Sequence, residues 1–269
     1  MTTYAKLPTL AGAEPAHVSF TDPDTWSAYG AQWNSGEQKT LQCCAVIDET
    51  HDVKTFVFRC ADWRALSFEP GQFITVSPII AGQSVSRCYT ISSSPTRPFA
   101  LSITVKRVPR GTVSNWLHDH LNAGDTLLAS GPAGSFTPVG RPAAKLLYLS
   151  AGSGVTPLMS MTRASFDMAA RLDIVFVHSA RTPVDIIFHA ELNRMQARMP
   201  GLRVLNICEG PGVDTQWAGP IGRLDLALLQ ERVPDFKERE VFNCGPQGYM
   251  VAIKSLLKQG NFDFRHYHQ

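Results

Sequence analysis

Residues 152–157, Gly-Ser-Gly-Val-Thr-Pro, have the composition of a turn that binds phosphate. They follow an apolar run at 145–149 and precede a segment with helical character. Free backbone N–H groups and the positive end of a helix dipole meet at such a turn, and Pro157 suits the first helical turn. The third glycine of the dinucleotide fingerprint is missing, and the next strand ends in His178-Ser179 rather than in an acidic residue. This departure disfavours an ordinary Rossmann dehydrogenase, and a glycine turn without a ligand is the alternative.

A second possible anion site lies earlier in the chain. Residues 111–114, Gly-Thr-Val-Ser, lead into a predicted helix at 114–121. Upstream of it, Arg87 and Tyr89 fall on one face of a predicted strand, with Thr90 on the other. An aromatic face beside a bidentate cation suits a ring system joined to a phosphate, although a strand with an exposed arginine would look the same. Two anion sites in different parts of the chain indicate a pair of phosphate-bearing ligands.

The segments that must position these residues change character near residue 140. Between 41 and 107 the chain reads as short strands with polar and apolar alternation, separated by Pro and Gly turns, and a further strand is expected at 125–129. This pattern predicts an antiparallel Greek-key β-barrel or sandwich. We therefore expect three parts: an N-terminal extension at 1–38 that packs through its tryptophans, an antiparallel β domain at 39–140, and an α/β domain at 141–269.

In the third part, buried-type strands alternate with amphipathic helices. Apolar runs at 145–149, 172–177 and 204–207 are separated by helical patterns. The helical faces consist of residues spaced three or four apart: Phe188, Leu192, Met195 and Met199 in one, and Met250, Ile253 and Leu257 in the other. Such βαβ repetition predicts a parallel, Rossmann-like sheet with ligands at the carboxyl ends of its strands.

Composition excludes several classes of protein. Lys and Arg number 25 against 23 Asp and Glu, a net charge of +2, so nucleic acid is a poor candidate partner. No apolar run reaches the roughly 18 residues of a membrane span, and the N-terminus has no secretory h-region, so we expect a cytoplasmic protein without a membrane contact. The six cysteines lack the spacing of a disulfide framework, zinc ribbon or plant-type iron–sulfur site. His266 and His268 lack an obvious third ligand, so no metal is expected.

Four motifs in order carry a resemblance to a known family. They are Arg87-x-Tyr89-Thr90, Gly111-Thr112-Val113-Ser114, Gly152-x-Gly154-x-Thr156-Pro157 and Cys244-Gly245-Pro246. The ordered set resembles the ferredoxin-NADP reductase superfamily over residues 40–260. The segment 180–188 is similar to NADH-oxidising reductases of Rieske-type oxygenases or of the hybrid-cluster protein, which usually carry a C-terminal plant-type ferredoxin domain.

The resemblance implies an FAD site in the β domain. Arg87 would bind the flavin phosphates, Tyr89 would stack on the isoalloxazine, and Thr90 would hydrogen-bond near flavin N5. A pyrophosphate cradle at the helix start favours FAD over FMN. The further cofactor-binding positions in this half are Ile91, Val105, Lys106, Gly111, Thr112, Val113 and Ser114.

The resemblance also implies a nicotinamide-nucleotide site in the α/β domain. Cys244 would lie beside the nicotinamide C4 and, with Tyr89 and Thr90, make up the catalytic set. Arg181 would lie beside the adenosine ribose. An arginine at this position by itself favours a 2′-phosphate and therefore NADPH. The neighbouring residues, however, are similar to those of NADH-oxidising reductases, so we expect NADH. The remaining nucleotide-binding positions are Gly152, Gly154, Val155, Thr156, His178, Gly245 and Pro246.

These roles imply a flavoprotein reductase. Hydride would pass from NADH to FAD, and single electrons would go on to a [2Fe-2S] ferredoxin domain or protein that serves a terminal oxygenase or the hybrid-cluster protein. The chain stops at Gln269 without such a domain, so we expect either a separate partner or a truncated chain, acting as a monomer. Whether Tyr267 covers the flavin, as the terminal aromatic of plant-type members does, stays open.

Two other classes of function are weighed against this one. A serine hydrolase would use Ser153, but Ala151 stands where the G-x-S-x-G elbow needs its first glycine. A non-catalytic flavin- or nucleotide-binding module of a larger complex would bind flavin without being reduced by NADH.

Overall fold

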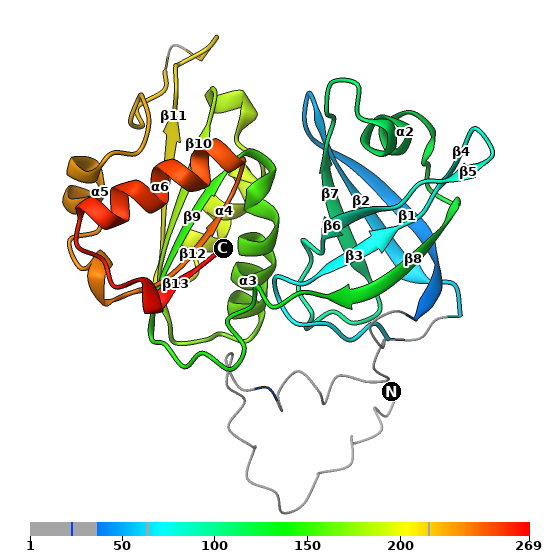
Figure 1. Cartoon of the computed structure of the whole chain (residues 1–269), viewed down its shortest axis with the longest axis horizontal. Coiled ribbons are helices and arrows are strands. Elements are labelled where there is room, and N and C mark those ends of the chain that lie inside the picture. Colours follow the sequence, from blue (N-terminus) through cyan, green and yellow to red (C-terminus); the bar gives the residue numbers. More distant parts are fainter. Residues whose placement is uncertain (1–22, 24–36, 63–64, 215) are drawn as a thin grey trace, which may run out of the picture.

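The computed structural model describes residues 23, 37–62, 65–214 and 216–269. The expected N-terminal extension at 1–38, with Trp26 and Trp33, lies outside the described residues except at positions 23, 37 and 38. In the described part, no helix combines the length and apolar character that crossing a bilayer requires. Figure 1 shows two domains side by side, with helix α3 at the boundary between them.

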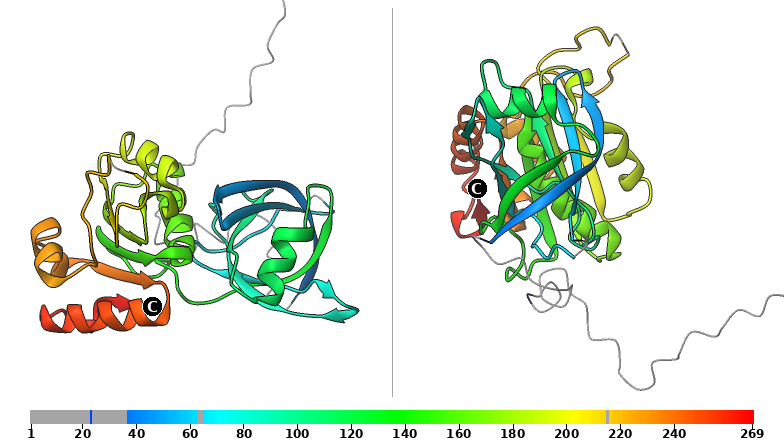
Figure 2. Two further views of the ribbon diagram at one scale, coloured as in Figure 1. Left: turned by 90° about the horizontal axis from the view of Figure 1, so that it is seen from above. Right: turned by 90° about the vertical axis from the view of Figure 1, so that its right-hand side faces the viewer.

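The first domain is a curled antiparallel sheet. Six strands pair in the order β6-β3-β8-β1-β2-β7, and a bridge between Ile91 and Ile103 links its two ends. Helix α2 (Thr112–His120) lies against this sheet, and the small hairpin β4–β5 extends from it (Figure 2). The strands are β1 (Gln38–Thr50), β2 (Val53–Cys60), β3 (Phe73–Val76), β4 (Ile79–Ile80), β5 (Gln83–Ser84), β6 (Arg87–Thr90), β7 (Leu101–Lys106) and β8 (Thr126–Ala133).

One detail of this sheet differs from the simple alternation expected of its strands. Phe56 and Phe58 are fully buried in the barrel core, but the polar residues of the opposite face are buried as well. Thr104 Oγ1 lies 2.7 Å from Thr55 Oγ1 and 2.9 Å from Ser92 Oγ. Hydroxyls suit this face because it looks toward the second domain rather than open solvent, and each finds a hydrogen-bond partner there.

The second domain is a five-stranded parallel sheet with helices on both faces. Its strand order is β11-β10-β9-β12-β13, so the order reverses between β9 and β12 as in doubly wound folds. Its strands are β9 (Lys145–Ala151), β10 (Asp173–Ala180), β11 (Leu202–Cys208), β12 (Glu240–Cys244) and β13 (Tyr267–His268). Its helices are α3 (Val155–Asp167), α4 (His189–Gln196), α5 (Leu226–Arg232) and α6 (Gln247–Gln259), with short 3-10 turns η1 (Gly152–Gly154), η2 (Pro183–Asp185), η3 (Phe236–Glu238) and η4 (Phe264–His266).

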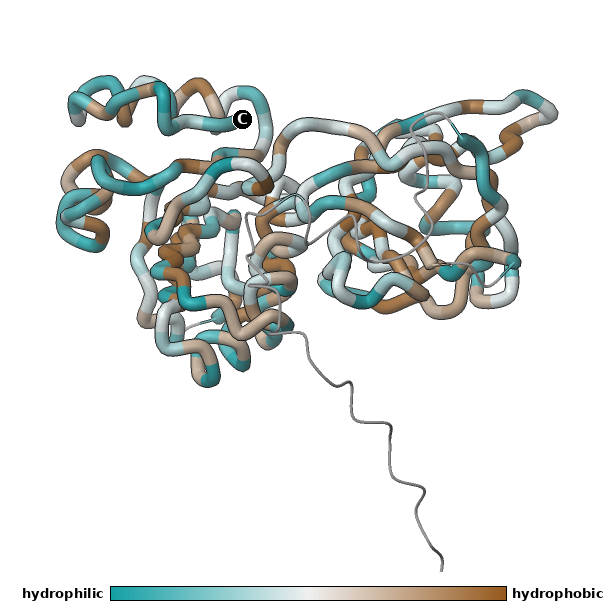
Figure 3. Tube along the Cα trace, turned by 90° about the horizontal axis from the view of Figure 1, so that it is seen from below, coloured by the Kyte–Doolittle hydropathy of each residue, from teal (hydrophilic) through white to brown (hydrophobic). Residues whose placement is uncertain are grey.

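Strand alternation decides which helices cover which face of this sheet. Tyr148 and Phe176 pack with α3 and α4, whereas Leu147 and Leu149 pack with α5 and α6. Hydrophobic stretches of the trace gather inside the domains in Figure 3. The predicted order of an antiparallel β domain followed by a parallel α/β domain is therefore confirmed. Two residues placed on the first helical face lie outside α4, Phe188 just before it and Met199 beyond its end, and both are buried all the same.

Helix α3 is hydrogen-bonded to the segment 92–97 of the first domain. Ser160 Oγ and Arg163 Nη1 donate to two backbone carbonyls of that segment at 2.7 and 2.6 Å. Arg97 binds both carboxylate oxygens of Asp167, at 2.7 and 3.0 Å. Because 92–97 directly follows strand β6, the helix that begins at the glycine turn is tied to the strand that carries the predicted flavin residues.

At the opposite end of the second sheet, one arginine joins the beginnings of several strands. The Arg239 side chain is 1% exposed and donates to Asp173 Oδ2 at 2.7 Å and to Asp235 at 2.9 Å. It also reaches the carbonyls of Leu146 and Asp173. Removal of a buried charge leaves its partners uncompensated, which is strongly destabilising.

We predict that Arg239→Ala lowers the free energy of unfolding by about 3–5 kcal/mol, as measured by urea denaturation. Arg265→Ala is the control, because Arg265 also pairs with an aspartate but is 85% exposed; it should change stability little, since exposed ion pairs contribute little. Equal losses in the two variants would contradict the structural role given to Arg239.

Candidate cofactor and nucleotide site

A cavity of about 640 Å³ lies between the two domains and is lined by both of them. The first domain contributes strand β6, the end of β7 and the start of α2. The second domain contributes the glycine turn, the last residue of β12 and the two residues that follow this strand. The four motifs that are spread over the sequence therefore meet at one place, where the carboxyl ends of the parallel strands face the β domain.

Strand β6 presents Arg87 and Tyr89 to this cavity. Arg87 is exposed, and its Nη1 donates only to the neighbouring carbonyl of Ser86, at 2.7 Å, among the contacts of the described residues. Tyr89 is half-buried against the barrel core, and this burial raises the pKa of its hydroxyl to about 12. A neutral aromatic ring beside an accessible guanidinium fits a flavin with its phosphate.

The start of helix α2 is built to receive an anion. No side chain caps the helix, and its first turn holds no acidic residue, so its leading N–H groups are available. Ser114 Oγ accepts a hydrogen bond from the N–H of Val108, at 3.2 Å. A Cβ at Gly111 would lie 2.5 Å from that Oγ, so a larger residue there would displace the Ser114 hydroxyl. The residues present fit a pyrophosphate.

The glycine turn at the start of α3 has the same properties. Its helix also lacks a side-chain cap and acidic residues in its first turn. Gly152 has a φ of +52°, and a Cβ at Gly154 would lie 2.3 Å from the carbonyl oxygen of Cys244. Both glycines are therefore required, one for backbone conformation and the other for the close approach to strand β12. This turn fits a second pyrophosphate.

Cys244 ends strand β12 at the floor of the cavity. Burial raises the pKa of its thiol to about 11. The side chain is therefore neutral at physiological pH, a small weakly polar group rather than a thiolate nucleophile.

A second cavity of about 500 Å³ continues from the first across the end of the parallel sheet. The two share Lys106, Ser153 and Pro246 among their lining residues. The second also contains Arg181, at the end of β10, and Tyr249 of α6. An extended dinucleotide could place one end in each cavity with its pyrophosphate at the glycine turn.

Most of the predicted site residues are brought together, and three are not. The first cavity is lined by Arg87, Tyr89, Thr90, Val105, Lys106, Gly111, Thr112, Val113, Ser114, Gly154, Thr156, Cys244, Gly245 and Pro246, and the second adds Gly152 and Arg181. Ile91, Val155 and His178 are fully buried and line neither cavity. Ile91 packs in the barrel core, and Val155, the first residue of α3, packs in the core between that helix and the parallel sheet.

His178 has an internal partner instead of a ligand contact. Its Nδ1 lies 2.8 Å from Ser150 Oγ, and burial lowers its pKa to about 4, so the imidazole is neutral. The partner is Ser150 rather than Ser153, which gives the hydrolase alternative no nucleophile–base pair.

The C-terminal residues lie elsewhere. Tyr267 lines a different cavity, and its hydroxyl accepts a hydrogen bond from Asn243 Nδ2 at 2.8 Å. His266 Nδ1 and His268 Nε2 contact the two oxygens of Glu240 at 2.8 and 2.6 Å. Residues 267 and 268 form an edge strand that pairs with β12, and the Glu240 carboxylate of β12 holds the two histidines.

Tyr249 is a site residue that sequence reasoning missed. Its ring lines the second cavity, and burial raises the pKa of its hydroxyl. A Cβ at Gly245 would lie 2.8 Å from the ring, so the two residues are in close contact. The sequence did hold a signal for Tyr249. It falls in the first turn of a helix that follows Gly245-Pro246, and a side chain in that turn points back toward the end of the strand.

Two protein-family models match the chain. The oxidoreductase FAD-binding domain matches residues 41–137, and the oxidoreductase NAD-binding domain matches residues 148–255. Among curated relatives, the glycine betaine monooxygenase reductase subunit of Chromohalobacter salexigens is 51% identical over 238 residues, which cover 88% of this chain and 64% of the relative. The stachydrine N-demethylase reductase subunit Stc4 of Rhizobium meliloti is 38% identical, covering 88% of this chain and 67% of the relative.

Solved structures share the fold. The cytochrome b5 reductase domain of Ulva prolifera nitrate reductase superposes with a TM-score of 0.76 at 23% identity, covering 87% of this chain and 97% of that one. The ferredoxin reductase in carbazole 1,9a-dioxygenase superposes with a TM-score of 0.73 at 25% identity, covering 86% of this chain and 68% of that one. The present chain spans about two thirds of the length of the curated relatives it matches.

We predict that Tyr89→Ala weakens FAD binding by roughly tenfold, because loss of an aromatic contact face costs about 1 kcal/mol or more. Titration of the apoprotein with FAD, followed by flavin fluorescence, measures the dissociation constant. Tyr267→Ala is the matched control and should leave that constant unchanged, since Tyr267 faces another cavity. If Tyr267→Ala instead weakened FAD binding more than Tyr89→Ala did, Tyr267 would be the residue that covers the flavin.

Proposed function

The chain belongs to the oxidoreductases that join an FAD-binding domain to an NAD-binding domain, and from this premise we propose that it is the NADH-oxidising reductase component of an oxygenase system. In this role it oxidises NADH at bound FAD and delivers electrons one at a time to a [2Fe-2S] ferredoxin domain or protein. The observation that carries the proposal is the pair of adjoining cavities, each of which ends at an uncapped helix start suited to a pyrophosphate.

Bound FAD supplies the redox chemistry, since a flavin accepts two electrons from a nicotinamide and releases them singly. The chain's own residues supply binding and orientation. Arg87 and the N–H groups at the start of α2 hold phosphates, and Tyr89 offers a ring to stack on. Thr90 and the neutral thiol of Cys244 line the cavity from opposite domains, so Thr90 would hydrogen-bond near flavin N5 and Cys244 would lie beside the nicotinamide.

The partner is proposed from the names of the relatives. Two of them are reductase subunits, of a glycine betaine monooxygenase and of a stachydrine N-demethylase. We therefore propose a terminal oxygenase as the final electron acceptor, reached through a ferredoxin centre. A monomeric state and a cytoplasmic location complete the proposal; all six cysteines are free thiols, as a reducing compartment favours.

The test of the function is reduction of a one-electron acceptor by the FAD-loaded chain. We predict that anaerobic NADH reduces a purified plant-type [2Fe-2S] ferredoxin, one electron to each cluster, so that one NADH serves a pair of ferredoxin molecules. The loss of ferredoxin absorbance measures the yield. Flavin that is reduced without passing electrons to any ferredoxin would contradict the role in electron transfer, and flavin that NADH leaves oxidised would favour the non-catalytic module.

We also predict that Cys244→Ala slows anaerobic reduction of the flavin by NADH about tenfold or more, because small errors in the positions of reacting groups are costly. Stopped-flow absorbance measures this rate, and the dissociation constant of FAD should change less than threefold. Cys44→Ala is the control, because Cys44 is exposed on β1 and lines neither cavity. An unchanged rate in Cys244→Ala would place Cys244 away from the nicotinamide.

A further inference from the structure

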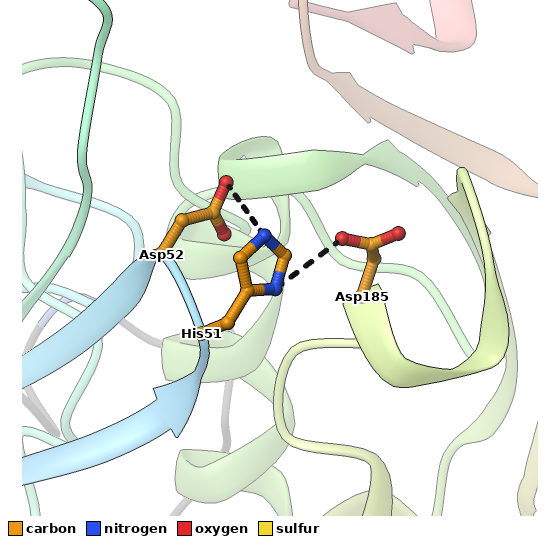
Figure 4. A group of neighbouring side chains, drawn as sticks. All are labelled: His51, Asp52 and Asp185. Atoms are coloured by element: carbon orange, nitrogen blue, oxygen red, sulfur yellow. Dashed lines mark ion pairs between the residues drawn. The ribbon is translucent and has the colours of Figure 1, made fainter. Parts of the chain in front are cut away.

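A group of polar side chains joins the two domains at the mouth of the second cavity. His51 and Asp52 come from the turn between β1 and β2, and Asp185 comes from η2 of the second domain (Figure 4). The imidazole of His51 lies between the two carboxylates, 3.8 Å from Asp52 and 3.9 Å from Asp185. The turn that carries Asp52 in the first domain therefore lies next to the loop that follows β10 in the second domain.

Two cations of the cavity are engaged by these carboxylates. Arg181 Nη2 lies 2.9 Å from Asp185 Oδ1 and 3.4 Å from Asp52 Oδ2. Lys106 Nζ lies 3.1 Å from the same oxygen of Asp52. Burial acts to raise the pKa of Asp52, but Lys106 and the hydrogen bond from Thr50 together outweigh it and hold that pKa below its ordinary value. The carboxylate is therefore charged at neutral pH.

A divalent metal does not suit this group, although one ligand atom from each of His51, Asp52 and Asp185 lies within 4.8 Å of the others. The carboxylate oxygens are already bound by Arg181 and Lys106. A metal ion would have to displace these two cations or lie next to them, against their repulsion.

The position of the group in the fold indicates what it faces. Strand β9 leads into the glycine turn, and β10 lies beside it in the sheet. In doubly wound folds the end of this second strand meets the adenosine ribose, where an acidic residue binds the 2′-hydroxyl of NAD or an arginine accommodates the 2′-phosphate of NADP. Arg181 and Asp185 occupy that end, so both kinds of side chain are present.

We propose that Asp52, acting across the domain boundary, is a specificity-determining residue that makes the site prefer NADH over NADPH. Together with Asp185 it occupies Arg181, the side chain that would otherwise pair with a 2′-phosphate. It also places negative charge where the phosphate would add about two further charges. The inference rests on the proposed use of a nicotinamide nucleotide and adds the residue that selects between its two forms.

Asp52 is a cleaner target for mutation than Asp185. Asp185 Oδ2 also accepts hydrogen bonds from the N–H and hydroxyl of Thr182, at 3.1 and 2.6 Å, so its loss would disturb the loop itself. Asp52 Oδ1 accepts a hydrogen bond from Thr50 Oγ1 at 3.1 Å, which an asparagine can keep. Asp52→Asn therefore removes the charge and retains the shape.

The test is binding by calorimetry, with the full FAD-loaded chain and two probes, adenosine 2′,5′-bisphosphate and AMP. For Asp52→Asn we expect the affinity for the bisphosphate relative to AMP to rise at least tenfold, and the kcat/KM ratio of NADPH to NADH to rise with it. Asp48→Asn is the control from strand β1, because Asp48 is 80% exposed and pairs with Lys54. It should leave the ratio unchanged.

A double variant tests whether Asp52 acts through Arg181. In Asp52→Asn combined with Arg181→Ala the gain for the bisphosphate should disappear, whereas an unspecific loosening of the loop would keep it. If Asp52→Asn still binds AMP but its affinity for the bisphosphate relative to AMP is unchanged, the inference is overturned and the proposed function stands. A wild-type chain that binds neither probe overturns the nucleotide site itself. A wild-type ratio that changes on addition of a chelator assigns the group to a metal and also overturns the inference.

Discussion

The site depends on the docking of helix α3 against segment 92–97 of the β domain. The first turn of α3 offers backbone N–H groups to an anion, and its later turns carry Ser160, Arg163 and Asp167, which bind that segment. Since 92–97 continues directly from β6, one rigid helix fixes the distance between the nucleotide turn and the residues predicted to hold the flavin. The two cofactor sites are thus a single geometric unit although they belong to different domains.

Both phosphate sites rely on backbone N–H groups at helix starts, and Arg87 adds an accessible cation at the flavin site. The helix starts at 112 and 155 lack capping side chains and acidic residues, while Arg181 and Lys106 are held by carboxylates. This agrees with a chain whose net charge is only +2. Backbone N–H groups recognise a pyrophosphate in a fixed orientation without attracting polyanions in general, and the carboxylates add discrimination at the ribose end.

The sequence predicted what depends on local pattern. Strand alternation and βαβ repetition predicted the fold, whereas most residues that line the cavity were expected from the resemblance of four ordered motifs to a reductase superfamily. It could not predict contacts between distant residues, such as that of Arg163 with the carbonyl of Ser92 or of Arg181 with Asp52. His178 shows the same limit, because a polar residue at a strand end reads as a ligand until its partner Ser150, on the neighbouring strand, is known.

The central claim is that the docked domains let NADH reduce FAD directly. It is tested by an anaerobic titration of the FAD-loaded chain with NADH, followed by the visible absorbance spectrum. The account predicts a yellow protein whose flavin bands bleach completely at one NADH per FAD. A protein that retains no FAD, or one whose yellow spectrum excess NADH leaves unchanged, would contradict it.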